Sequence, residues 1–155
     1  MKGSAVFSKD RRYRYALRRV WDPARPTVLF IGLNPSTTDH RVNDRTISRC
    51  IRFARDWEFG QLIVANLFAF RTPYPRELWR ERDPVGPRND RWLRRLIAES
   101  DTTVAAWGTG GARHERDRAV LALLSQPKCL AISKDGHPKH PLYIRATTSL
   151  RDFTG

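Results

Sequence analysis

The chain has 155 residues, with 29 Lys and Arg against 16 Asp and Glu, so its formal net charge is +13. A chain of this length suggests one domain with a sizeable core, and 40% hydrophobic with 29% charged residues is typical of a globular protein, which excludes a disordered tail. No apolar run of about 18 residues is present, which excludes a transmembrane helix, and the first residues lack the apolar core of a signal peptide.

A β-hairpin is predicted at the start of the chain. Residues 5–8 and 13–17 are strand-forming segments joined by a polar turn, and aromatic residues alternate with Arg in the second segment. Two prolines break the chain soon afterwards. Residues 1–26 are therefore interpreted as a hairpin extension to a core of residues 27–155, the two forming a single domain over residues 1–155.

Strands and helices are predicted to alternate along the rest of the chain. Continuous apolar runs of strand length predict strands buried on both faces at residues 28–33, 62–68, 102–107 and 129–132. Apolar residues at helical spacing predict helices over residues 44–58, from about 89 to 97, and around 120–124. This alternation predicts an α/β fold of three layers, with a central, mainly parallel four-stranded sheet between the helices.

Two cysteines, Cys50 and Cys129, are too few for a disulfide framework, a four-cysteine zinc site or an iron–sulfur cluster. Both lie in predicted apolar segments, so we expect them to pack in the core rather than to act as nucleophiles. His137 and His140 with Asp135 could hold a metal, but the chain has only four His and no compact ligand motif. We therefore expect no metal and no cofactor. We expect the protein to be in the reducing environment of the cytoplasm.

Arginine carries most of the excess positive charge, since Lys occurs only at positions 2, 9, 128, 134 and 139. The guanidinium group binds phosphate through two hydrogen bonds and stacks on bases, which the ammonium group of Lys does less well. The charge therefore predicts a nucleic acid, DNA or RNA, or a nucleotide as partner, and no membrane. The alternative is an Arg-rich composition inherited from a GC-rich genome.

Polar or small residues follow each predicted strand. In open α/β sheets, ligands bind outside the carboxyl ends of the parallel strands, so these residues are expected to line one composite pocket. The Gly-rich residues 108–111 lack the spacing of a dinucleotide-binding motif and are interpreted as a turn. The residues at the four strand ends are, in chain order, Asn34, Pro35 and Ser36, then Asn66, then Trp107 and Gly108, then residues 137–141.

Three of these residues are the main candidates for chemistry. The amide oxygen of Asn34 can orient a water molecule, and His140 can hydrogen-bond a leaving group that develops negative charge. The amide of Asn66 can recognise the donors and acceptors on the edge of a base. Structural roles stay open for each: Asn34 as a loop or cap residue, Asn66 as a strand-end residue bonded to the backbone, and His140 as a surface group.

Two family resemblances follow from short motifs. The whole chain resembles the family called domain of unknown function 1643, through residues 33–37, 43–47, 66–69 and 83–86 and the stretch from Lys134 to Tyr143. Residues 28–145 also resemble the uracil-DNA glycosylase superfamily, whose motifs occur here in the same order. They are Gly32-Leu33-Asn34-Pro35-Ser36, Leu62-Ile63-Val64-Ala65-Asn66, Ala106-Trp107-Gly108 and His140-Pro141-Leu142.

The superfamily resemblance implies a fold like that of uracil-DNA glycosylase and hydrolysis of the N-glycosidic bond of a damaged or modified base, flipped out of nucleic acid. By this resemblance Asn34 orients the attacking water, His140 stabilises the departing base, and Asn66 recognises it. Leu142 takes the position of the wedge that fills the vacated stack. The alternatives are a nucleic-acid-binding module without cleavage, and a hydrolase or transferase that acts on a nucleotide or modified nucleoside.

The remaining site residues are less well defined. Phe68 or Phe70 is expected to supply the aromatic ring that stacks under the base. Asp39 and Asp44 are candidates for a general base, a metal site or helix caps, with a cap favoured for Asp44. Five basic residues near the same loops are the predicted phosphate contacts, namely Arg41, Arg45, Arg49, Arg71 and Lys139.

Overall fold

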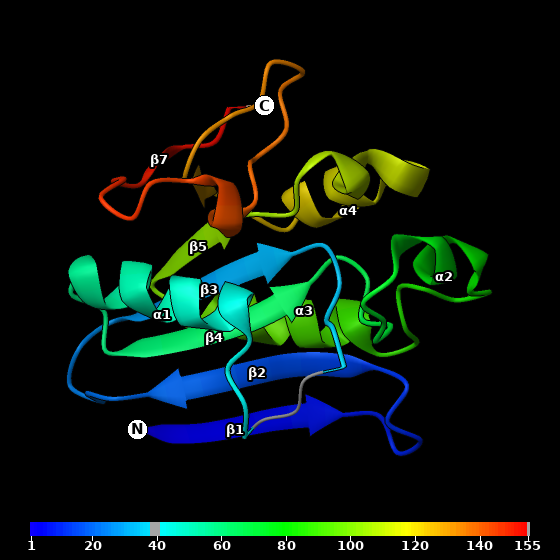
Figure 1. The fold of residues 1–155 in the computed structure, drawn as a ribbon, viewed down its shortest axis with the longest axis horizontal. Helices are drawn as coiled ribbons and strands as arrows, with labels where there is room; N and C mark the ends of the chain where they lie inside the picture. Colours follow the sequence, from blue (N-terminus) through cyan, green and yellow to red (C-terminus); the bar gives the residue numbers. More distant parts are fainter. Residues whose placement is uncertain (38–40, 155) are drawn as a thin grey trace.

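A mixed sheet forms the centre of the protein in the computed structural model, which describes residues 1–37 and 41–154 (Figure 1). Within these residues the sheet has seven strands in the order β1-β2-β4-β3-β5-β6-β7. The strands are β1 (Lys2–Phe7), β2 (Arg14–Val20), β3 (Thr27–Gly32), β4 (Gln61–Asn66), β5 (Thr102–Ala105), β6 (Lys128–Cys129) and β7 (Arg151–Asp152).

The four central strands β4, β3, β5 and β6 are parallel, as predicted. The prediction of a four-stranded sheet with a separate hairpin is wrong, because the hairpin is part of the sheet. Strand β2 pairs antiparallel with β4, and β1 pairs antiparallel with β2. Leu17 lies opposite Val64 in this pairing. A long edge left open at β4 would expose unpaired backbone groups, and the hairpin covers that edge. The short strand β7, which was not predicted, pairs with β6 at the other edge.

Helices cover both faces of the sheet, which gives the predicted three layers (Figure 1). The helices are α1 (Arg45–Asp56), α2 (Pro75–Arg80), α3 (Asn89–Glu99) and α4 (Arg116–Leu121). Of these, α2 was not predicted. Along β3, Val28 and Phe30 pack toward α1, whereas Leu29 and Ile31 pack toward the face that carries α3 and α4. No described helix combines the length and the apolar character that a membrane span requires.

Helix α1 forms where the sequence predicts it. Ile47, Cys50, Ile51 and Ala54 are buried at the predicted helical spacing. The side chain of Asp44 accepts a hydrogen bond from the backbone N–H of Ile47 at 2.8 Å, which caps the first turn. The helix and the capping role of Asp44 are therefore confirmed, although α1 ends at Asp56, before the predicted end at residue 58.

The fourth central strand is shorter than the predicted range 129–132, because the chain turns back on itself beyond Leu130. Lys139 donates its backbone N–H to the carbonyl of Ala131 at 2.9 Å, and Ser133 donates to the carbonyl of His137 at 2.7 Å. These bonds close a narrow hairpin that uses the backbone groups a longer β6 would need. The hairpin returns the chain to the carboxyl end of the sheet, where His140 follows.

Both cysteines are buried, in agreement with the prediction that they pack in the core. Burial raises the pKa of the Cys50 thiol and of the Cys129 thiol, because a thiolate would be poorly solvated at either position. Neither cysteine is therefore suited to act as a nucleophile at neutral pH.

We predict that Leu17→Ala lowers the free energy of unfolding of the whole protein by about 2–5 kcal/mol, because Leu17 is buried in β2 against the α1 face of the sheet. Urea unfolding followed by circular dichroism measures this loss. The matched control is Arg18→Ala, one residue along the same strand, which removes a surface ion pair with Glu99 and should cost less than about 1 kcal/mol. An unchanged transition midpoint for Leu17→Ala would show that the hairpin is not part of the cooperative core.

Candidate functional site

A small cavity of about 210 Å³ lies at the carboxyl ends of β3, β4 and β5. Parallel pairing brings these three strand ends to one edge of the sheet, and the loop that carries His140 and Pro141 closes over them. The cavity is lined by six of the predicted site residues, Asn34, Pro35, Ser36, Asn66, Trp107 and His140. The expected composite pocket is therefore present.

Part of the cavity lining is apolar. Phe30, Val64 and Ala106 contribute from the strands and the segment after β5, and Ile47 and Cys50 contribute from α1. An engineered apolar cavity of about 150 Å³ holds a benzene molecule. A cavity of this size and lining has room for one heterocyclic ring of the size of a nucleobase.

Asn34 is held by its amide nitrogen. Its Nδ2 donates to the backbone carbonyl of Thr72 at 2.8 Å, to that of Pro35 at 3.1 Å and to that of Phe70 at 3.4 Å. These bonds tie the loop after β3 to the segment after β4, and they determine which end of the amide is the nitrogen. The oxygen Oδ1 is therefore the acceptor that the side chain can offer to a water molecule in the cavity.

Asn66 places an unused hydrogen-bond donor in the cavity wall. The residue is 4% exposed, and its Nδ2 makes no hydrogen bond to any described residue. An unsatisfied buried amide costs about 1–3 kcal/mol, so this Nδ2 calls for a hydrogen-bond acceptor, either a water molecule or a ligand. Gly32, its partner across the β3–β4 pair, makes this position possible, because a Cβ there would lie 3.0 Å from Oδ1 of Asn66.

His140 presents a neutral N–H donor. Its Nδ1 accepts a hydrogen bond from the backbone N–H of Leu142 at 3.2 Å, which leaves the proton of the neutral ring on Nε2. Burial lowers the pKa of His140 below its usual value, and the nearby carboxylate of Asp44 opposes this shift. At neutral pH the ring can therefore donate a hydrogen bond from Nε2 without carrying a charge.

The two carboxylate oxygens of Asp44 accept different hydrogen bonds. Oδ1 caps α1, and Oδ2 accepts a hydrogen bond from the hydroxyl of Ser36 at 3.0 Å. Both residues line the cavity, so the cap also brings a carboxylate to the site. Asp39, the other predicted acid, lies outside the described residues. Within the described part of the chain, no group of three or more His, Cys, Asp and Glu is placed to hold a metal ion.

Arg14 lines the cavity and was missed by the sequence analysis. It begins β2 and is 3% exposed, and its backbone N–H donates to the carbonyl of Ala69 at 3.0 Å. Burial lowers the pKa of Arg14 to about 10, while Asp44 opposes the shift, so the guanidinium stays charged at neutral pH. The sequence shows Arg14 only as part of the alternation of Arg with aromatic residues in the hairpin. This pattern does not show that β2 lies beside β4, so it does not place Arg14 in the cavity.

The predicted aromatic residues do not lie in the cavity. Phe68 packs edge-on against Trp79 in the core on the opposite face of the sheet, with ring centroids 5.4 Å apart. Phe70 packs edge-on against Tyr13 at 6.0 Å. The prediction that Phe68 or Phe70 supplies a ring to this pocket is therefore wrong, because β4 ends at Asn66 and the following residues turn away from α1. Phe30 is the phenylalanine in the cavity lining.

A wider cleft of about 920 Å³ adjoins the small cavity. The two share four lining residues, Leu33, Thr46, Trp107 and His140. Gly108, Lys139 and Leu142, which were predicted as site residues, line this cleft and not the small cavity. Gly108 precedes a 3₁₀ helix, Thr109–Glu115, and the backbone N–H of Gly111 donates to the carbonyl of Gly108 at 3.3 Å, which agrees with the predicted turn.

The predicted phosphate contacts are dispersed around the site. Arg41 and Arg45 are exposed, and Arg49 is half-buried on α1. Arg71 donates to the backbone carbonyl of Thr37 at 2.7 Å and to that of Arg11 at 2.9 Å, so its guanidinium joins the hairpin turn to the loop after β3. Lys139 alone of these five lines the wide cleft, and none of them lines the small cavity.

The fold and site define an α/β protein with a small, partly polar pocket at the carboxyl edge of its parallel strands. The family model described as "Protein of unknown function (DUF1643)" matches residues 14–142, and the chain belongs to this family. The resemblance to that family is thus confirmed. No significant match was found among curated proteins or among solved structures, and nothing in these comparisons supports the resemblance to the uracil-DNA glycosylase superfamily.

We predict that His140 titrates below 6.5, its ordinary pKa, and that Asp44→Asn lowers its pKa further because the carboxylate that opposes the shift is removed. Asn keeps the cap of α1, so the fold is preserved. Imidazole NMR signals followed against pH measure both values.

The lowered pKa of His140 also makes the free energy of unfolding depend on pH. Between the lowered pKa and 6.5, the unfolded chain binds more protons than the folded one, so stability falls as the pH drops through this window. His140→Gln should remove this part of the pH dependence. A pKa at or above 6.5 for His140 would contradict the assignment of a buried, neutral ring.

Proposed function

We propose that the protein hydrolyses the N-glycosidic bond of a damaged or modified base that is flipped out of nucleic acid into the small cavity. The single observation that carries this proposal is the buried Nδ2 of Asn66, unsatisfied among the described residues, in a cavity of nucleobase size. The cavity also contains the Nε2 donor of His140 and the acceptor of Asn34, which are the groups that this reaction needs.

Recognition of the base begins with Asn66. Its Nδ2 can donate to a carbonyl oxygen or a ring nitrogen on the edge of the base, while Phe30 and Ala106 contact the apolar faces of the ring. A base without an acceptor at this position would leave the amide unsatisfied, and such mismatches are strongly discriminated against. Asn66 is therefore proposed as the residue that selects the base.

Cleavage follows from the remaining groups. The bond between C1′ and the base nitrogen breaks, its electron pair passes to the base, and positive charge develops on the sugar. His140 donates a hydrogen bond from Nε2 to the developing base anion. A water molecule held by Oδ1 of Asn34 attacks C1′, and its proton finally neutralises the base. The carboxylate of Asp44 is placed to accept that proton on the way.

The charge of the chain supports nucleic acid as the partner. The net charge of +13 favours a polyanion, and Arg45 and Arg41 are exposed next to the first turn of α1, which borders the cavity. A buried guanidinium at Arg14 adds positive charge inside the cavity, where it stabilises negative charge on a departing base.

The proposal predicts release of a free base. Oligonucleotides that each contain one modified base, among them uracil, hypoxanthine and alkylated bases, are incubated with the protein, and products are measured by mass spectrometry and by cleavage of the strand at abasic sites. The expected result is an abasic site with at least one substrate. Tight, salt-dependent binding without release of any base would instead identify a binding module, and release from free nucleosides alone would identify a nucleoside hydrolase.

The site residues have distinct expected effects on base release. Asn34→Ala and His140→Ala should each lower the rate by about 10²–10³-fold, because each removes a group that acts on the transition state. Asn66→Asp should change which base is released, because it replaces the donor Nδ2 with an acceptor. His114→Ala, an exposed histidine outside the cavity, is the control and should leave the rate unchanged. Full activity in both alanine variants of the site would show that the assignment is wrong.

A further inference from the structure

Tyr143 presents an exposed aromatic ring in the lining of the wide cleft. Tyr143 is the last residue of the 3₁₀ turn Pro141–Tyr143 and lines the cleft. It is 84% exposed, more than any other large hydrophobic residue that the structure describes. Leu142, for which the sequence analysis proposed the position of the wedge, is half-buried. The ring offered to solvent beside the site is therefore that of the tyrosine.

Tyr143 is held in place by its backbone. Its N–H donates to the carbonyl of His140 at 3.1 Å, and Ile144 donates to the carbonyl of Pro141 at 3.3 Å. The ring centroid of Tyr143 lies 5.9 Å from that of His140, with the planes tilted by 59°. The aromatic ring is thus placed by a short turn next to the proposed catalytic residue, although burial contributes little to its position.

The dimensions of the cleft restrict what can occupy it. A volume of about 920 Å³ lies within the range of about 300–1,000 Å³ that accommodates molecules of a few rings. In a nucleic-acid duplex the bases are paired and stacked on one another, so their faces are not available to a protein ring. A short stretch of single strand fits a cleft of this volume, and the faces of its bases are open to stacking.

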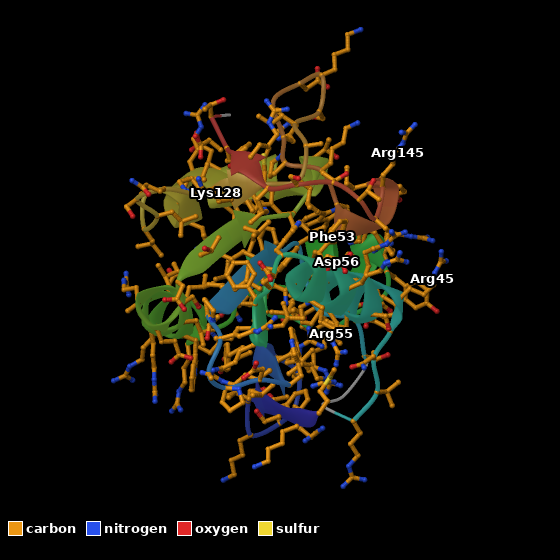
Figure 2. All side chains as sticks on the ribbon, turned by 90° about the vertical axis from the view of Figure 1, so that its left-hand side faces the viewer. Arg45, Phe53, Arg55, Asp56, Lys128 and Arg145 are labelled. Carbon is orange, nitrogen blue, oxygen red and sulfur yellow. The ribbon has the colours of Figure 1, made fainter. Side chains whose placement is uncertain are left out.

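The surroundings of the cleft carry the charge that a strand requires. Lys139 lines it, and Thr109 and Ser133 add hydroxyl groups that can hydrogen-bond phosphate oxygens. Arg45 and Arg145 are exposed and project outward from the same side of the molecule (Figure 2). Proteins that bind a single strand combine an aromatic ring, on which a base stacks, with cationic groups that contact the phosphates.

We infer that the wide cleft binds an unpaired segment of nucleic acid, and that Tyr143 stacks on the base next to the one that enters the small cavity. The inference rests on the proposed function for the base in the cavity, but binding of the strand does not require cleavage. The substrate is accordingly a single strand or an unpaired loop.

Fluorescence anisotropy with a labelled 12-residue single strand, and with the duplex of the same sequence, tests the inference. Tyr143→Ala should weaken single-strand binding by about 5–100-fold, the range found when a stacking aromatic side chain is replaced by alanine. Tyr143→Phe should keep the affinity, because the ring and not the hydroxyl stacks. Tyr74→Ala is the control: Tyr74 is 62% exposed and lies at the rim of the cleft, between the lining residues Pro73 and Pro75, but is not itself a lining residue. Its loss should leave binding unchanged, because the inference assigns stacking to Tyr143.

The results of these binding measurements test the inference independently of the proposed function. Unchanged binding by Tyr143→Ala, an equal loss in Tyr74→Ala, or tighter binding of the duplex would each overturn the inference. Heparin, a polyanion without bases, should bind Tyr143→Ala as well as the unchanged protein, and a parallel loss there would also overturn stacking. If binding of the strand depends on Tyr143 but no base is ever released, the proposed function is wrong and the inference stands.

Discussion

The site depends on one close approach, between Gly32 at the end of β3 and Asn66 at the end of β4. The two residues are paired across parallel strands, and a Cβ at position 32 would lie 3.0 Å from Oδ1 of Asn66. Without a side chain at position 32, the amide of Asn66 can lie over the strand end and into the cavity. A Cβ at position 32 would press against this amide, so glycine at this position favours the placement of the buried donor on which the proposed chemistry depends.

Backbone hydrogen bonds hold the other groups around that pair. The three carbonyls that accept from Asn34 fix the loop after β3 against the segment after β4, and the narrow hairpin beyond β6 returns His140 to the same edge. A catalytic group held in this way needs little reorganisation during a reaction. Asn66 Nδ2 and Trp107 Nε1, both in residues that line the cavity, are buried without a hydrogen bond to a described residue, and under the proposed function a bound base satisfies the amide of Asn66.

Some features were predictable because they depend on local chemistry and on the geometry of parallel sheets. The helical spacing and the Asp44 cap define α1, and strand ends of a parallel sheet meet at one edge, which brings Asn34 and Asn66 together. Phe68 was misplaced because an apolar run does not show on which residue a strand ends, and a change of one residue moves a side chain to the other face. Helix α2 and strand β7 are short elements with weak local signals.

The sequence by itself determined the α/β class, the parallel core strands and the polar residues at their ends, because hydrophobic periodicity and buried-strand length are local properties. Only the tertiary structure decided that β2 pairs with the edge of β4, which brings Arg14 into the cavity, and that Tyr143 rather than Leu142 is the exposed residue beside His140. Strand pairing and exposure depend on contacts between segments far apart in the chain, and no window of sequence contains both partners of such a contact.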